Sequence, residues 1–237
     1  MSKRNLLLAS SSNCHPHDYL LHIEDVIREL FQGVDEVLFV PFARPSGLSH
    51  DEYTAVAAKG FAKFGLKVRG LHEFADPITA VKNAQGMFTG GGNTFVLLSE
   101  LYRQELLKPM RNQILEGTPY LGTSAGSNIA GMTIGTSNDM PIVYPPSFAA
   151  LSIIPLNLNP HFPALPPDPT HKGETREDRI HEFHLYNEQP VIAIREDSAL
   201  RIQGDSMRLC GTRPAMLFKP QFAPEEIAQD AELSHLL

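Results

Sequence analysis

The feature that most constrains the fold is an alternation of short apolar runs with amphipathic stretches through the first half of the chain. Predicted strands cover residues 5–9, 37–42, 66–71 and 87–89. The intervening stretches carry apolar residues at helical spacing, which predicts helices over residues 18–32, 51–64 and 94–107. This alternation is typical of a parallel sheet sandwiched between helices. We therefore expect an α/β fold that binds its ligand beyond the carboxyl ends of the strands.

The second half of the chain has a different character. Residues 141–169 are rich in proline, which predicts long loops. Further strands are expected over residues 191–194, 199–203, 207–210 and 215–218, some of them forming a hairpin. Residues 225–237 are weakly helical and are expected to form either a docked helix or a loose tail. We find no internal repeat or linker, so residues 1–237 are expected to form a single domain.

Composition excludes several classes of protein. The 237 residues carry a net charge of −7 with no basic run, which argues against a nucleic-acid partner. No apolar run is long enough for a membrane helix, and residues 1–9 do not resemble a signal peptide. Two cysteines, Cys14 and Cys210, indicate no disulfide framework, so a cytoplasmic location is expected.

A candidate nucleophile follows the short apolar run at residues 120–121. Residues 122–126 read G-T-S-A-G, which matches the G-x-S-x-G pattern of a sharp strand-to-helix turn. Such a turn exposes the central side chain, here Ser124, at a helix N-terminus that favours negative charge. The N–H group of Ala125 would then stabilise an oxyanion. A glycine-rich turn without chemistry is the alternative interpretation of this motif.

Polar or glycine-rich segments also follow two other predicted strands. Ser10 begins the cluster S-S-S-N after the first strand, and residues 90–93 read G-G-G-N after the fourth. Glycines let backbone N–H groups approach a ligand closely, so residues 90–92 are candidates for the second half of an oxyanion hole. A plain strand-to-helix turn would have the same composition.

Five segments together resemble one enzyme family. They are G-G-G-N-T-F at residues 90–95, G-T-S-A-G-S-N at 122–128, T-S-N-D-M-P-I-V at 136–143, N-P-H-F at 159–162 and H-K-G-E-T-R at 171–176. In this order they resemble the peptidase E family (peptidase family S51) of α-aspartyl dipeptidases, which is related to cyanophycinase. The resemblance runs from about residue 6 to residue 218.

The resemblance implies a fold like that of class I glutamine amidotransferases and a serine peptidase that needs no cofactor. It implies cleavage after an N-terminal aspartate, mainly in dipeptides. Ser124 would be the nucleophile, and His161 of N-P-H-F would be the base. The oxyanion-hole N–H groups would come from Ala125 and from Gly92, with Gly91 as its neighbour.

The remaining site residues have competing interpretations. The acid that orients His161 is expected to be Glu196, at the end of the strand predicted over residues 191–194, with Asp139 as its rival. Arg176 is the candidate for binding the substrate β-carboxylate, because arginine binds carboxylates through two parallel hydrogen bonds. A surface ion pair is its alternative role. Asn93 is a second candidate for substrate binding.

Metal binding is not expected. Cys14, His15 and His17 lie close together in sequence, but no second cluster supplies the further ligands that a structural zinc needs. The expected partner is a small acidic peptide, and the protein is expected to be a monomer or a homodimer. The functional alternatives are an amidase, a cyanophycinase-like enzyme acting on another aspartyl substrate, and a non-catalytic module that binds acidic peptides.

Overall fold

The structure is a computed structural model that describes residues 3–164 and 172–237. Its larger sheet has seven strands: β1 (Asn5–Ala9), β2 (Glu36–Val40), β3 (Lys67–Gly70), β4 (Met87–Thr89), β5 (Tyr120–Thr123), β8 (Ser198–Gln203) and β9 (Ser206–Gly211). Their order is β3-β2-β4-β5-β1-β8-β9. The first five are parallel to one another, whereas β8 runs antiparallel to β1 and forms the expected hairpin with β9. The mostly parallel α/β sheet expected from the sequence is confirmed.

Helices cover both faces of this sheet. The α-helices are α1 (Glu24–Leu30), α2 (His50–Phe61), α3 (Pro77–Lys82), α4 (Thr94–Arg103), α5 (Leu107–Leu115), α6 (Ala125–Asn128) and α7 (Arg176–Phe183). Alternate residues of β1 enter different apolar clusters: Leu7 packs with α1 and α2, and Leu8 packs with α3, α4 and α5. Within the described ranges, no helix has the length and apolar character needed to cross a bilayer.

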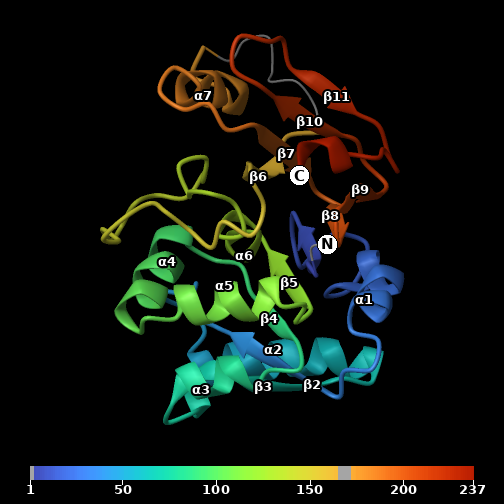
Figure 1. Cartoon of the computed structure of the whole chain (residues 1–237), viewed down its shortest axis with the longest axis vertical. Coiled ribbons are helices and arrows are strands. Elements are labelled where there is room, and N and C mark those ends of the chain that lie inside the picture. Colours follow the sequence, from blue (N-terminus) through green and yellow to red (C-terminus); the bar gives the residue numbers. More distant parts are fainter. Residues whose placement is uncertain (1–2, 165–171) are drawn as a thin grey trace.

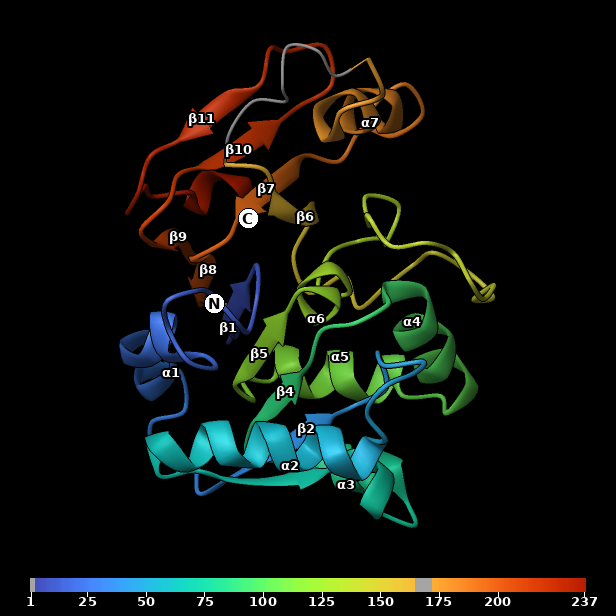
Figure 2. The same ribbon diagram turned by 180° about the vertical axis from the view of Figure 1, so that it is seen from behind.

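A second, four-stranded sheet was not expected from the sequence. It contains β6 (Asn157–Phe162), β7 (Val191–Arg195), β10 (Ala215–Phe218) and β11 (Glu225–Ile227), in the order β11-β10-β7-β6. Figures 1 and 2 show this sheet and α7 at the opposite end of the molecule from α2 and α3. The described residues therefore form two sheets, and the larger of these is mostly parallel and covered by helices on both faces.

Two sequence expectations are corrected in this region. Residues 157–161 were expected to be a loop, but they form edge strand β6, because an edge strand tolerates a proline such as Pro160. The expected helical tail instead contains strand β11 and only a short 3₁₀ helix, Ser234–Leu236. Strand β11 joins the smaller sheet, and the end of the tail is bonded to the larger one, where the Leu233 N–H donates to the Met207 carbonyl at 2.7 Å.

Two predicted helices are shorter than expected. The helix expected over residues 18–32 begins only with a 3₁₀ turn, Leu21–Ile23, which leads into α1, because Leu20 has a left-handed backbone. The helix expected over residues 94–107 ends at Arg103 as α4, shortly before Glu105, which also has a positive φ, and α5 beyond it was not predicted. Residues 141–156 form loops as predicted, whereas residues 165–169 lie outside the described residues.

The carboxyl ends of β1, β4 and β5 lie at the same edge of the larger sheet, since these strands are parallel. Helix α6 begins directly beyond β5 and packs tightly against β4. A Cβ atom added to Gly126 would lie 2.1 Å from the backbone oxygen of Thr89. Because that oxygen belongs to the main chain of the sheet, only glycine fits at this crossing.

We expect Gly126→Ala to destabilise the fold by about 3 kcal/mol or more, because the new methyl group collides with the backbone of a central strand. Gly47→Ala is the matched control. It also replaces a glycine by alanine, at a position with φ 86°, but no atom lies within 4 Å of the added Cβ. The free energy of unfolding of this control should fall by only about 1 kcal/mol, the cost of a left-handed backbone in alanine. Urea unfolding of both variants measures the difference, and equal losses would contradict the packing argument.

Candidate functional site

Ser124 occupies a sharp turn between β5 and α6. Its φ of 53° and ψ of −111° are unusual for a residue other than glycine. The turn is held because the Ser124 N–H donates to the Ala9 carbonyl at 3.2 Å. A Cβ atom on Gly122 would lie 2.5 Å from the Gly126 oxygen, so the flanking glycines of the motif are required by close packing. The side chain of Ser124 is thereby set beyond the end of the sheet.

His161 reaches Ser124 from the second sheet. It lies near the end of β6 with φ 59°, where the pairing with β7 shifts register between Pro160 and Phe162. Its Nε2 atom is 2.9 Å from Ser124 Oγ. Its Nδ1 atom is hydrogen-bonded to Glu196 Oε1. The structure therefore aligns three groups: the hydroxyl of the residue after β5, an imidazole of β6 and the carboxylate of the residue after β7.

The Glu196 carboxylate is suited to hold the imidazole in one tautomer. Burial raises the pKa of Glu196, but the hydrogen bond and the charge of His161 lower it more, so the pKa lies below its ordinary value. An ionised carboxylate accepts the Nδ1–H bond and leaves Nε2 free to accept the hydroxyl proton. Such a chain can convert a serine hydroxyl into a nucleophile.

Asp139 lies at a different place, the N-terminus of α4. Its Oδ2 atom accepts hydrogen bonds from the Thr94 N–H at 2.8 Å and from Thr94 Oγ1 at 2.6 Å. Asn93, the residue that caps α4, accepts from the Val96 N–H and donates from Nδ2 to the Met140 carbonyl. The structure thus places both side chains in the bonds that join the turn around Asp139 to this helix.

The triple glycine lies next to the serine. A Cβ atom on Gly91 would lie 2.9 Å from Ser124 Cβ. The Gly91 carbonyl accepts a 3.0 Å hydrogen bond from the buried hydroxyl of Tyr53, and burial raises the pKa of that hydroxyl, which therefore stays protonated. In a trans peptide the following N–H, that of Gly92, points the opposite way from this carbonyl. Gly92 has φ 148°, a conformation that favours glycine.

Ala125 provides a further N–H group, because it is the first residue of α6. The first N–H groups of a helix have no partner within it, and the helix dipole favours negative charge there. Gly91 and Gly92 make no backbone N–H hydrogen bond within residues 3–164 and 172–237. The glycine loop and the first residue of α6 are thus the two backbone segments next to Ser124.

Arg176 is the first residue of α7, and its side chain contacts the backbone of His161. Its Nη1 atom donates to the carbonyls of Pro160, at 3.2 Å, and His161. Its Nε and Nη2 atoms make no hydrogen bond to the described part of the chain. Burial and the charge of Arg179 lower the pKa of Arg176, but an arginine remains cationic at neutral pH. His171, from the same sequence motif, lies outside the described residues.

The sequence interpretation missed two individual residues at this site. Ser10 was noted only as part of a polar cluster, yet its buried hydroxyl accepts a hydrogen bond from the His161 N–H at 2.8 Å. Tyr53 was assigned only to a helix, and its bond to Gly91 joins positions 38 residues apart. Position after a strand end was the one available signal for Ser10. No local signal could have identified Tyr53.

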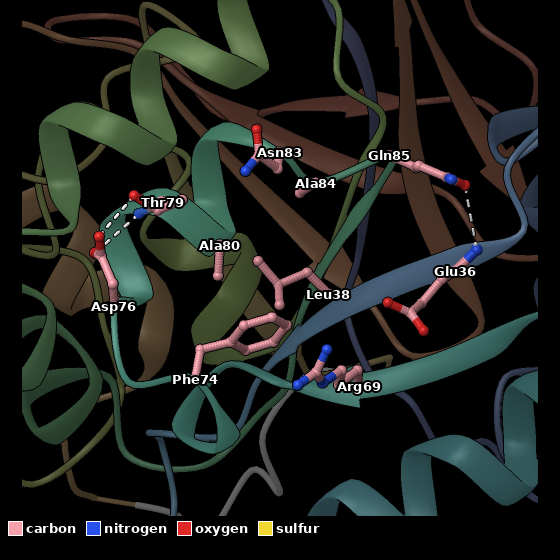
Figure 3. A pocket seen from close by; sticks show the side chains of 10 residues that line it. All are labelled: Glu36, Leu38, Arg69, Phe74, Asp76, Thr79, Ala80, Asn83, Ala84 and Gln85. Carbon is pink, nitrogen blue, oxygen red and sulfur yellow. Dashed lines mark hydrogen bonds between the residues drawn. The ribbon is translucent and has the colours of Figure 1, made fainter.

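A separate hollow of about 380 Å³ lies beside α3 and the outer strands β2 and β3. Figure 3 shows two of its polar side chains bonded to neighbouring residues: Asp76 accepts from Thr79, and Gln85 accepts from the Glu36 N–H. It includes the amino end of β2, whereas Ser124 follows the carboxyl end of parallel strand β5. The hollow is therefore not part of this site.

The cysteine and histidines near the N-terminus form a turn. The His17 N–H donates to the Cys14 carbonyl at 2.7 Å, with His15 between them. Over residues 3–164 and 172–237 there is no group of three or more His, Cys, Asp or Glu side chains placed to hold a metal ion.

Comparison with known proteins shows which family the chain resembles. The family model described as "Peptidase family S51" matches residues 6–210. The "Probable alpha-aspartyl dipeptidase" of Drosophila melanogaster is 47% identical over 239 residues, covering 100% of this chain and 98% of that protein. The "Peptidase E" of Streptomyces coelicolor is 46% identical over 235 residues, covering 98% and 95%.

The fold is shared with a solved structure. A crystal structure of a peptidase from an acI-B1 actinobacterium superposes with a TM-score of 0.73 at 16% identity, covering 98% of this chain and 97% of that one. This likeness concerns the fold alone. The sequence relatives extend over nearly the whole chain and confirm the resemblance seen in the five motifs. The chain belongs to peptidase family S51.

Proposed function

We propose that the protein is a serine-type exopeptidase that hydrolyses dipeptides and small peptides after an N-terminal aspartate. The observation that carries this proposal is the 2.9 Å contact between Ser124 Oγ and His161 Nε2, with Nδ1 of the same ring bonded to Glu196. Nucleophile, base and orienting acid in such an arrangement support acyl transfer. The chain order Ser, His, Glu differs from that of α/β-hydrolases, but the geometry of the three roles is the same.

In the first half of the reaction, Ser124 Oγ attacks the carbonyl carbon of the N-terminal aspartate while His161 Nε2 accepts the hydroxyl proton. The N–H groups of Gly92 and Ala125 stabilise the oxyanion, and Gly91 supplies the adjoining peptide. Glu196 stabilises the positive imidazolium. His161 then protonates the departing amine, the peptide C–N bond breaks, and an ester between aspartate and Ser124 remains.

In the second half, a water molecule attacks this ester and gives its proton to His161 Nε2. Collapse of the second tetrahedral intermediate returns the proton to Ser124 Oγ and releases aspartate. The sum of both halves is one peptide bond and one water consumed, with one free amine and one free carboxyl group formed.

Aspartate selectivity requires a cation near the acyl side of the site, and Arg176 is our candidate. The protein is acidic overall, so a locally placed cation is needed to attract a negatively charged substrate. The Nε and Nη2 atoms of Arg176 can donate to both oxygens of a carboxylate. The name of the Drosophila melanogaster relative, "Probable alpha-aspartyl dipeptidase", supports the same substrate class. We assign Asn93 to the support of the glycine loop.

We further propose that the enzyme works in a reducing compartment such as the cytosol. Cys14 and Cys210 are both free thiols in the structure. Proteins from oxidising compartments commonly use their cysteines in disulfides.

Ser124→Ala should lower kcat on Asp-Leu by about 10⁴- to 10⁶-fold, because the members of such a triad act as a unit. A dipeptide hydrolysis assay measures the loss, and a serine-directed phosphonate should label the wild type but not the variant. Near-wild-type turnover in the variant would refute the assignment. Tight Asp-Leu binding without phosphonate labelling of the wild type would instead favour the peptide-binding module.

Glu196→Gln should lower kcat by about 10²- to 10⁴-fold, because a neutral amide no longer stabilises the imidazolium or selects its tautomer. Asp139→Asn is the matched change at the rival position, and it should mainly lower stability, because Asp139 bonds Thr94 and not His161. Steady-state kinetics on Asp-Leu compares the two. A larger loss of kcat in Asp139→Asn would reverse their roles.

The pH dependence of stability provides a control for the Glu196 assignment. Because folding lowers the pKa of Glu196 from its ordinary value of 4.5, its charge stabilises the fold above that value. The contribution disappears as the pH falls through the lower, folded-state pKa. The stability advantage of the wild type over Glu196→Gln should therefore be full above pH 4.5 and shrink as the pH falls below that value.

Arg176→Ala should reduce kcat/KM about 100-fold more on Asp-Leu than on Ala-Leu, because it removes the partner of a desolvated carboxylate. Arg176→Lys keeps the charge without the planar fork and should restore only part of the difference. Equal losses on the two dipeptides would refute the selective role. Including β-linked Asp-Arg in the panel tests the cyanophycinase-like alternative, which predicts that this substrate is preferred over Asp-Leu.

A further inference from the structure

Ser10, the residue directly after β1, joins the two sheets through its side chain. Its hydroxyl donates to the Ile194 carbonyl of β7 at 3.1 Å and accepts from the His161 N–H at 2.8 Å. The residue is fully buried, so no substrate can touch it. We propose that Ser10 is a positioning residue that fixes His161 for proton transfer, an inference that rests on the proposed function.

The backbone of His161 needs this support. His161 has φ 59° and sits where β6 shifts register against β7. A residue in such a bulge loses its regular ladder partner, so its N–H must find another acceptor. A left-handed conformation in a residue other than glycine persists only when surrounding contacts enforce it. The Ser10 hydroxyl supplies this acceptor and so fixes the orientation of the peptide that contains the His161 N–H.

The neighbouring peptide groups are also held by side chains. Arg176 Nη1 donates to the carbonyls of Pro160 and His161, and Asn138 Nδ2 donates to the Pro160 carbonyl at 3.2 Å. Both backbone polar groups of His161 are therefore bonded, its N–H to Ser10 and its carbonyl to Arg176. Of these two partners, Ser10 gives the clean test, because Arg176 is also proposed to meet the substrate.

The end of β1 connects the base to the nucleophile as well. The Ala9 carbonyl accepts from the Ser124 N–H, while the hydroxyl of the next residue, Ser10, accepts from the His161 N–H. Ser10 is itself anchored by its own N–H, which donates to the Ser198 carbonyl at 3.0 Å. Two consecutive residues thus set the positions of the two groups that exchange a proton.

The test compares Ser10→Ala with Thr136→Val. Thr136 has a nearly buried hydroxyl that donates to the Leu158 carbonyl at 2.8 Å, so it also bonds β6 but not His161. We expect Ser10→Ala to lower kcat on Asp-Leu about 10- to 100-fold with KM changed less than about twofold, since small misplacement of a catalytic group slows chemistry strongly. Thr136→Val should keep kcat within about twofold of wild type at a comparable loss of stability.

Ser10→Cys provides a second variant should the alanine variant fail to fold. It keeps a side chain of similar size but replaces the hydroxyl with a weak sulfur acceptor, so it should show the same loss of kcat. Labelling by a serine-directed phosphonate should slow in parallel in both Ser10 variants, which a loss of stability alone would not produce. All variants are measured well below their unfolding midpoints.

A wild-type kcat in a folded Ser10 variant, or an equal fall of kcat in Thr136→Val, would overturn the positioning role. The outcome is separable from failure of the proposed function. If Ser124→Ala is inactive while both Ser10 variants turn over Asp-Leu normally, only the positioning inference fails. If Ser124→Ala remains active, the proposed function itself fails.

Discussion

The contact between His161 and Ser124 spans the boundary between two sheets, and the whole site depends on it. Ser124 follows β5 of the larger sheet, whereas His161 and Glu196 lie on and directly after strands of the smaller one. Neither sheet carries a working set of groups by itself. The end of β1 is hydrogen-bonded on both sides of this boundary, through the Ala9 carbonyl to Ser124 and through the Ser10 hydroxyl to His161.

Much of the larger sheet could be predicted from the sequence, because local patterns determine it. Parallel strands buried on both faces require short apolar runs, and the runs of β1, β2 and β4 were identified from their composition. The glycines around Ser124 also carry a local signal, since residue spacing alone indicates a tight strand-to-helix turn. The placement of polar segments at the carboxyl ends of β1, β4 and β5 follows from parallel topology.

Strands β7 and β10 were predicted, but their assembly into a second sheet and the supporting contacts were not, because these depend on long-range pairing. Considered with its sequence neighbours alone, Pro160 predicts a loop. It fits into β6 because this strand lies at the edge of its sheet. The bonds of Ser10 to His161 and of Tyr53 to Gly91 join residues 151 and 38 positions apart. Glu196 was preferred to Asp139 only through its position after a strand and the family resemblance, and the three-dimensional structure shows that Glu196 is the one bonded to the imidazole.

Ser124 and His161 share a backbone property that sets stability against activity. Both have positive φ values, at 53° and 59°, a region where glycine has a lower conformational energy than residues with a side chain. Glycine at either position would relax the main chain but would remove the hydroxyl or the imidazole. At these two positions, substitutions that raise stability would therefore remove a side chain proposed to act in the reaction. Stabilising substitutions should be sought elsewhere in the chain.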